Sequence, residues 1–300
     1  MIKRRTFFGM AAAGMPAMAA SVVDVGSVKN RGTKKVEIAY KSPHAAPNGL
    51  QATRDGLWVV DDRSTDGLNY VSLVNFADGK VLREFQVAGL NQPSGMTVDA
   101  AGTIWINSTH SSLIFNCSAA DGKILAKYSC PGSGSIYRLK GDPPAARSPL
   151  SPAYPSATTE NAAGRGGRGR GAGLPPGQVP MTATAGPAGE GGQGMECRDG
   201  LMYIAVLPTR KLYVLDPKTW QVQNTWTLAG NRAHGVGWEG DTLWVSDTNW
   251  RAFFRHDMKT GEIIEKIQLT EKDPLIHGVT VHDGYLWYCD DLGYICNFKL

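Results

Sequence analysis

Five polar residues, each placed directly before a glycine, are the part of this sequence best suited to chemistry. They are Asn48, Ser94, Gln193, His234 and His277. Two imidazoles at equivalent positions of neighbouring repeats could share a divalent cation, or act as a general base and its partner. The alternative is that these side chains only form hydrogen bonds with loop backbone and water.

Three carboxylates extend this candidate set. Asp247 and Asp290 each follow an aromatic strand in the repeats that carry the two histidines. An aspartate at such a position commonly caps a turn, but beside imidazoles it can fix their tautomers or complete a metal site. Glu196, two residues after a repeat glycine, is expected to be a buried acid or one half of a salt bridge. We therefore predict catalytic roles for His234, His277 and Glu196, and metal ligation by Asn48, His234, His277, Asp247 and Asp290.

The elements that position these residues follow from a repeated phrase. The five glycines stand 46, 99, 41 and 43 residues apart, and each opens an alternating stretch, a turn and an aromatic-rich strand. Two further strands joined by turn residues follow most copies. Four antiparallel strands in about 40–46 residues, without helical periodicity, are typical of a β-propeller blade. The fold class is therefore predicted to be all-β.

The repeat count predicts five blades, although six stay open because one interval is long. The fifth repeat ends at Leu300 after only three strands, and residues 35–40 form an isolated strand before the first repeat. If this N-terminal strand supplies the outer strand of the last blade, the ring closes and leaves no edge exposed.

Blade topology decides which loops share a face. In a four-stranded up-and-down blade, the loop before the inner strand and the loop after the second strand lie at the same end of the ring. This end collects the residues before the glycines, and with them a set that we predict to bind substrate: His44, His110, Arg210, Trp250 and Arg251.

The first twenty residues are predicted to be an export signal rather than part of the fold. Lys3-Arg4-Arg5, a weakly apolar run and Ala17-Met18-Ala19 resemble a twin-arginine signal with its cleavage site. The apolar run is too short to span a bilayer. We expect residues 21–33 to be a linker, residues 34–300 to be one propeller domain, and the protein to be periplasmic or secreted.

The long interval between the second and third repeats is read as an insertion at residues 131–192. It is rich in Gly, Pro, Ala and Arg, as in the run RGGRGRGAG at 165–173, and it shows no strand pattern. Such a composition favours disorder. A loop without function, a lid over the ring mouth and an arginine-bearing arm for an anionic partner all stay open.

Charge argues against nucleic-acid binding. The formal net charge is +4 for the whole chain and +1 without the predicted signal, and the insertion carries much of the remaining positive charge. The predicted body is therefore not a basic nucleic-acid binder. We also expect no membrane span and a monomer.

The five cysteines do not predict a crosslinked fold. They show no C-x-x-C spacing, so neither a structural zinc site nor a disulfide framework is indicated. Cys289 and Cys296 could face each other across a hairpin. However, the twin-arginine route carries proteins already folded in a reducing cytoplasm, so free buried thiols are favoured.

The repeat phrase is similar to a known group of propellers. Asn48-Gly49-Leu50 and the run from Ser94, SGMTVDAAGTIWI, resemble recurring elements of SMP-30/gluconolactonase-like proteins, NHL-repeat proteins and streptogramin (virginiamycin B) lyases. The resemblance covers nearly the whole chain after the predicted signal, except the insertion. It is a blade signature, and so it speaks for the fold more than for the chemistry. Those families have six or seven blades. Five blades are found in plant-type glutaminyl cyclases, whose motifs do not occur in this chain.

The resemblance also implies candidate ligands. In gluconolactonase-like members a divalent metal at the channel mouth is held by Glu, Asn and Asp, and Asn48 matches an Asn position. Ser94, His234 and His277 stand where Asn or Asp is expected, and no glutamate matches, so zinc or another metal that accepts imidazole ligands fits better than calcium. In streptogramin-lyase-like members a histidine base acts with a magnesium-binding acid, which His277 or His234 with Glu196 could imitate.

These observations predict an exported propeller enzyme, a hydrolase or a lyase. It would act on a small molecule at the channel mouth, with a divalent metal (Zn, Ca or Mg) as a candidate cofactor. The alternative is a non-catalytic propeller that binds a carbohydrate, a peptide or a partner protein on the same face.

Overall fold

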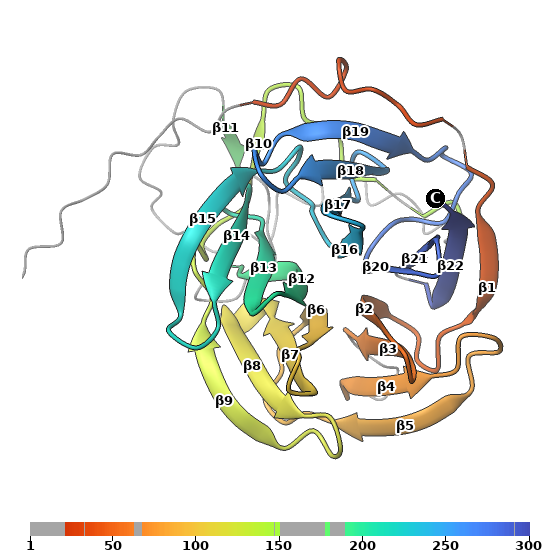
Figure 1. Ribbon diagram of the computed structural model, residues 1–300. Coiled ribbons are helices and arrows are strands. Elements are labelled where there is room, and N and C mark those ends of the chain that lie inside the picture. The colour runs from red at the N-terminus through yellow and green to blue at the C-terminus, as the bar shows by residue number, and fades with distance from the viewer. Residues whose placement is uncertain are drawn as a thin grey trace, which may run out of the picture.

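The protein is a ring of five four-stranded antiparallel sheets, one for each repeat (Figure 1). The computed structural model describes residues 22–32, 34–62, 68–146, 148–150, 178–180, 190–290 and 292–300. The predicted signal and the arginine-rich run at 165–173 lie outside these residues. The all-β prediction is confirmed, and five blades rather than six form the ring.

The strand bounds follow the repeat phrases. Blade 1 contains β2 (Pro47–Thr53), β3 (Gly56–Asp61), β4 (Tyr70–Val74) and β5 (Val81–Gln86). Blade 2 contains β6 (Pro93–Val98), β7 (Thr103–Ser108), β8 (Leu113–Ser118) and β9 (Ile124–Ser129). Blade 3 contains β12 (Gly192–Arg198), β13 (Leu201–Val206), β14 (Lys211–Asp216) and β15 (Gln221–Thr227). Blade 4 contains β16 (Val236–Glu239), β17 (Thr242–Asp247), β18 (Ala252–Asp257) and β19 (Ile263–Gln268). Blade 5 contains β20 (Val279–His282), β21 (Tyr285–Cys289), β22 (Tyr294–Lys299) and β1 (Glu37–Lys41).

The N-terminal strand closes the ring, as predicted. β1 pairs antiparallel with β22, with Glu37 opposite Asn297 and Lys41 opposite Tyr294. The last blade is thereby completed by the first strand of the chain, so the inner faces of blades 5 and 1 share a core. The one helix in the described residues, η1 (Thr109–Ser111), has three residues. No helix in this part of the chain is long and apolar enough to cross a bilayer.

The repeat glycines are the contacts between neighbouring blades. A Cβ on Gly49 would lie 2.0 Å from the carbonyl oxygen of Ser94, and a Cβ on Gly95 would lie 1.9 Å from that of Gln193. Each of these glycines therefore lets one inner strand touch the backbone of the next. Irregular register at Pro47/Gly49, Pro93/Met96 and Gly192/Met195 marks the same position in three blades.

The cysteines are free thiols, as the export route led us to expect. Cys289 pairs in register with Ile295, and Cys296 pairs with Tyr288. Because partners in register point to the same face and alternate residues to opposite faces, the two cysteines face away from each other. They pack in different apolar clusters of blade 5.

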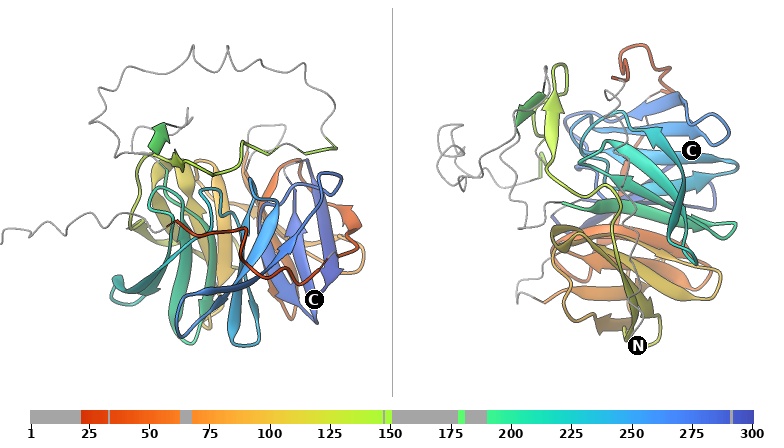
Figure 2. Two further views of the ribbon diagram at one scale, coloured as in Figure 1. Left: turned by 90° about the horizontal axis from the view of Figure 1, so that it is seen from above. Right: turned by 90° about the vertical axis from the view of Figure 1, so that its left-hand side faces the viewer.

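Residues 131–146, which we call the mouth strap, are the described part of the insertion that lies across one end of the ring (Figure 2). Its strand β10 (Tyr137–Leu139) pairs with β11 (Gln178–Pro180). Asp142 of the strap forms an ion pair of 2.6 Å with Arg210, and both side chains are buried. The amide of Asn249 is bound too, since its Oδ1 accepts the backbone N–H of Ala146.

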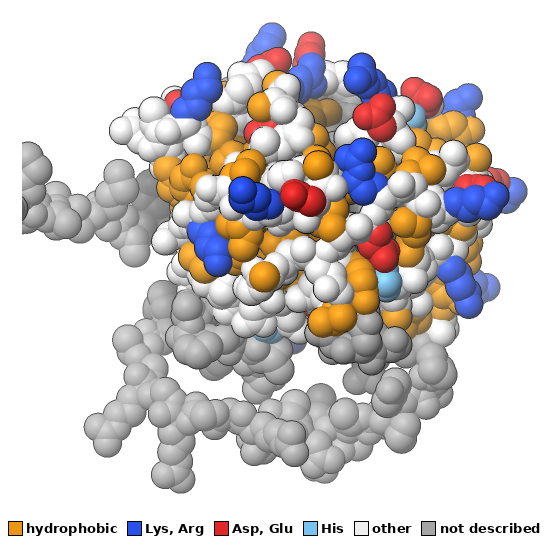
Figure 3. All heavy atoms as spheres, turned by 90° about the horizontal axis from the view of Figure 1, so that it is seen from below, with side chains coloured by type: hydrophobic (Ala, Val, Ile, Leu, Met, Phe, Trp, Pro, Cys, Tyr) orange, Lys and Arg blue, Asp and Glu red, His pale blue; other side chains and the backbone are white. Residues whose placement is uncertain are grey.

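The segment before β1 lies along the outside of blade 4. Lys266 bonds to the backbone of this segment on both sides, and Arg31 pairs with Glu239 and Glu265. On the side of the ring that carries β5 and β9, positive and negative side chains are mixed with apolar ones (Figure 3). That side shows no basic stripe of the kind that nucleic-acid binding requires.

Candidate functional site

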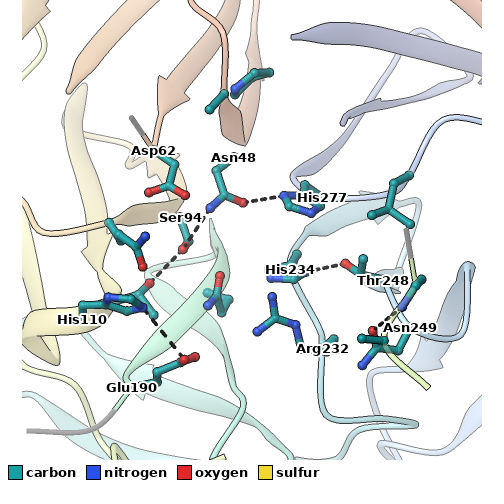
Figure 4. A pocket seen from close by; sticks show the side chains of 18 residues that line it. Asn48, Asp62, Ser94, His110, Glu190, Arg232, His234, Thr248, Asn249 and His277 are labelled. Carbon is teal, nitrogen blue, oxygen red and sulfur yellow. Dashed lines mark hydrogen bonds and ion pairs between the residues drawn. The ribbon is translucent and has the colours of Figure 1, made fainter. Parts of the chain in front are cut away.

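A cavity of about 410 Å³ opens at the strap end of the ring (Figure 4). All five residues that precede the repeat glycines line it, and so do Ala145 and Ala146 of the mouth strap. Its other charged or titratable lining residues are Asp62, His110, Glu190 and Arg232. The cavity is thus built from the entrances to all five inner strands, the loops beside them and described residues of the insertion.

A chain of hydrogen bonds runs around the first two blades. The amide of Asn48 donates to Ser94 Oγ at 3.4 Å, and Ser94 Oγ lies 2.8 Å from Thr109 Oγ1. Thr109 in turn donates to the carbonyl oxygen of Gly192 at 2.8 Å. These side chains are buried. They therefore serve mainly to hold Asn48 in place beside the histidines.

The two histidines stack face to face. The ring centroids of His234 and His277 are 4.5 Å apart, and the ring planes make an angle of 17°. His234 is buried with 2% of its surface exposed, whereas His277 is partly buried. Both rings line the cavity.

The hydrogen-bond partners fix one tautomer for both rings. Thr248 Oγ1 donates its single proton to the carbonyl oxygen of Ile276, so His234 Nδ1 must donate to Thr248 Oγ1. Nδ1 of His277 lies 3.1 Å from Asn48 Oδ1, which can only accept. In both neutral imidazoles the proton is thus on Nδ1, and Nε2 carries the basic lone pair.

The electrostatics keep the buried ring neutral. Burial lowers the pKa of His234 well below its ordinary value, and the charges of Arg232 and His277 add to this effect. At neutral pH His234 is therefore an uncharged hydrogen-bonding group.

The described residues do not form a ready metal site. No group of three or more His, Cys, Asp and Glu side chains in the described part of the chain is placed to hold a metal ion. Ligand lone pairs lie in the ring plane, so two rings inclined by only 17° do not aim at one point about 2.1 Å from each nitrogen. A divalent metal stays a prediction that would require one ring to turn.

A second titratable pair stands on the facing wall (Figure 4). His110 Nε2 lies 3.9 Å from Glu190 Oε1, and Glu190 is buried with 4% exposed. Burial raises the pKa of Glu190, although Arg232 opposes the shift. Burial and Arg232 together lower the pKa of His110. Glu190 therefore keeps its proton to a higher pH than an ordinary carboxyl group.

Glu196 lies in the channel but not in the cavity lining. Its carboxylate accepts hydrogen bonds from Gln51 Nε2 at 3.2 Å and from Thr97 Oγ1 at 3.4 Å. Burial raises its pKa to about 8, against the effect of these hydrogen bonds. The structure does not bring this acid together with His234 and His277 in the cavity, so we assign it no part in chemistry there.

The two predicted aspartate ligands cap turns. Asp247 accepts the backbone N–H groups of Arg232 at 2.9 Å and Trp250 at 3.1 Å. Asp290 accepts those of Leu292 and Tyr294. Neither aspartate lines the cavity, although Asp247 fixes the backbone of a residue that does.

Of the five predicted substrate-binding residues, only His110 lines the cavity. Arg210 is buried in its ion pair with Asp142 and so holds the mouth strap. His44 stacks on Tyr70 at 3.8 Å. The remaining two are absent from the lining: Trp250 packs in an apolar cluster with Val25, and Arg251 donates a hydrogen bond to backbone.

Sequence reasoning missed two charged residues of the cavity. Glu190 lies within the insertion, whose Gly, Pro, Ala and Arg-rich composition predicts no ordered element. Only its position just before the third repeat indicated that it could lie at the mouth. Arg232 stands two residues before His234, in a loop that topology already placed at the mouth. That spacing was the available signal.

Comparison with known proteins supports the fold. No protein-family model and no curated protein matches the sequence. Among solved structures, glutaminyl cyclase of Myxococcus xanthus is similar, with a TM-score of 0.56 and 10% identity over 89% of this chain and 97% of that chain. A streptogramin B lyase has a TM-score of 0.44 and 18% identity over 89% and 97% of the two chains. Virginiamycin B lyase from Staphylococcus aureus has a TM-score of 0.45 and 17% identity over 89% and 99%. The likeness to the glutaminyl cyclase agrees with the β-propeller fold described above.

Proposed function

We propose that this protein is an exported enzyme, a hydrolase or a lyase, that acts on a small molecule in the mouth cavity. The observation that carries the proposal is the stacked pair of histidines, whose hydrogen bonds leave Nε2 of both rings as the basic nitrogen. Export rests on the signal predicted at residues 1–20. The reaction class rests on general acid–base chemistry.

His277 is the general base in this proposal. Its Nε2 takes a proton from an attacking water in a hydrolysis, or from the substrate in an elimination. Asn48 Oδ1 accepts the hydrogen bond from Nδ1–H of His277, with 3.1 Å between nitrogen and oxygen. This hydrogen bond stabilises the positively charged ring that forms. His234, kept neutral by burial, accepts a second hydrogen bond and orients the water or substrate.

The facing wall of the cavity supplies the general acid of this proposal. Glu190 is that acid: burial raises the pKa of its carboxyl group, which favours the protonated form that gives a proton to the leaving group. His110, whose Nε2 lies 3.9 Å from Glu190 Oε1, is a titratable neighbour of this acid in the cavity. One proton is taken on one wall and one is given on the other, so the enzyme ends in a state from which exchange with water restores it.

A substrate screen tests the proposal. Wild-type protein is assayed against esters, lactones, amides and substrates with an eliminable group, and His277→Gln is compared on any that is turned over. We expect a loss of about 10²–10⁴-fold in kcat. The control is His282→Gln, because His282 stacks on Phe76 outside the cavity. Equal turnover by His277→Gln would refute the assignment.

Two further outcomes separate the alternatives. A wild-type protein that binds small molecules or peptides at the mouth but turns over none would favour the non-catalytic propeller. Stoichiometric metal in protein purified without chelator, lost in His234→Gln/His277→Gln, would show that a metal takes part and would replace the metal-free acid–base mechanism.

A further inference from the structure

Arg232 is a cation in the cavity whose guanidinium has no partner among the described residues. In the part of the chain that the structure describes, every other arginine donates a hydrogen bond or forms an ion pair: Arg31, Arg54, Arg83, Arg138, Arg198, Arg210, Arg251 and Arg255. Arg232 lines the cavity, and among these residues its guanidinium has no such contact. A partly buried cation without an anion is a costly arrangement that a ligand can relieve.

The backbone of Arg232 is fixed, so its side chain starts from a defined point. Its N–H donates to the buried carboxylate of Asp247 at 2.9 Å, and its carbonyl accepts the N–H of Thr248 at 3.0 Å. His234 follows two residues later. The loop therefore presents the cation and the buried imidazole together, as Figure 4 shows.

The charge of Arg232 acts on both walls of the cavity. It lowers the pKa of His234 on one side, and those of His110 and Glu190 on the other. The guanidinium is thus within electrostatic reach of all three groups. An anion bound to it would lie between the two walls.

We propose that Arg232 binds a carboxylate group of the substrate, which is therefore a small monocarboxylic acid. A planar guanidinium matches a carboxylate with two parallel hydrogen bonds. A phosphate dianion fits less well, because the carboxylate of Asp62 lines the same cavity and would repel a second negative charge. This inference rests on the proposed function, since it names the substrate class of that site.

The experiment measures binding rather than turnover. Acetate, benzoate and phenylacetate are titrated by ligand-observed NMR at constant ionic strength, each beside its neutral primary amide. We expect at least one carboxylate to bind wild-type protein clearly more tightly than its amide. Arg232→Gln should weaken that carboxylate by at least about tenfold and leave the amide unchanged. Inorganic phosphate should compete poorly.

The control variant is Arg198→Gln, which changes an arginine that lies over Trp238 at the other end of the ring. It should bind the carboxylates like wild type. The inference is overturned if no carboxylate of the set binds, if carboxylate and amide bind alike, if Arg232→Gln keeps the affinity, or if phosphate binds more tightly. His277→Gln should still bind the carboxylate, so a failure of the proposed base and a failure of this inference give different results.

Discussion

The axial channel contains two layers of side chains from the same inner strands, and only one of them opens to a cavity. The residues directly before the repeat glycines line the mouth cavity. The residues two positions after those glycines lie beyond its lining: Gln51, Thr97, Glu196, Gly237 and Thr280. Each layer holds a titratable group, His234 or Glu196, that burial keeps largely uncharged at neutral pH.

The difference between the layers lies in what their polar groups contact. The carboxyl group of Glu196 accepts hydrogen bonds from an amide and a hydroxyl group of neighbouring strands, so both oxygen atoms are bound to protein side chains. In the mouth layer Nδ1 of each imidazole is bound to a neighbouring side chain, and the guanidinium of Arg232 beside them forms no ion pair within the described residues. A polar residue in this channel is thus suited to chemistry by the polar atoms that a ligand can still contact, rather than by its residue type.

The strongest way to break both layers at once is a side chain at a repeat glycine. Gly95→Ala would place a Cβ 1.9 Å from the carbonyl oxygen of Gln193, so two inner strands must move apart. We expect a loss of at least about 3 kcal/mol of unfolding free energy, or no folding. Urea unfolding followed by tryptophan fluorescence measures it. Gly134→Ala is the control, since its Cβ would meet nothing closer than 3.8 Å; equal stability of the two variants would contradict the glycine contacts.

Glu196→Gln tests the closed layer. Its folded pKa of about 8 lies above the ordinary 4.5, so the folded state holds a proton that the unfolded state releases as pH rises. Stability from this group therefore falls between pH 4.5 and 8, by an amount on the order of 3–5 kcal/mol over the window. The glutamine variant should gain stability over wild type at pH 8 and little at pH 5. A difference that does not depend on pH would argue against a protonated Glu196.

Asp142→Asn acts on the cover of the mouth layer alone. It leaves Arg210 buried without its carboxylate, at a cost of about 3 kcal/mol that we expect to appear as release of the mouth strap. Hydrogen exchange of strap amides should accelerate while that of the inner strands stays unchanged. The exposed pair of Arg198 and Asp241 supplies the control, because Asp241→Asn should change exchange nowhere in the ring. Acceleration in the inner strands would mean that the strap supports the ring itself.

His234→Gln tests the open layer with the opposite sign. The folded pKa of His234 is lowered, so below about pH 6.5 the unfolded state binds a proton that the folded state does not. This group makes stability fall as pH falls, by at most about 1.4 kcal/mol per pH unit. Between pH 6.5 and 5 the variant should lose less stability than wild type, while His282→Gln should follow wild type. An unchanged slope in His234→Gln would show that the imidazole is charged in the folded protein.

The fold could be read from the sequence because its determinants are local and repeated. Alternation, turn residues and the glycine spacing define each strand within its own repeat. The isolated N-terminal strand and the three-stranded last repeat predicted that β1 completes blade 5, and the pairing of β1 with β22 confirms it. The free state of Cys289 and Cys296 was expected for another reason, the export route. The register adds that the two thiols point to opposite faces.

The candidate site could be read only in part. Topology placed the residues before the glycines, and His110, at one end of the ring, and all of them line the cavity. It could not tell that Arg210 is occupied by Asp142, because that partner comes from the insertion. For the same reason the sequence did not indicate Glu190, and the predicted substrate-binding residues included Arg210 and Arg251 rather than Arg232.

The sequence by itself determined the strands of each blade and the end of the ring where the residues before the repeat glycines lie, since these depend on periodicity within a repeat. The structure decided for five blades, where the long interval between the second and third repeats had left six open. Only the tertiary structure decided which polar groups remain available there. Whether Glu196 is enclosed, whether the histidines stack and whether Arg232 lacks an anion depend on side chains that meet from distant parts of the chain. Such meetings carry no local signal, because hydrogen bonds and charge pairs act through space rather than along the sequence.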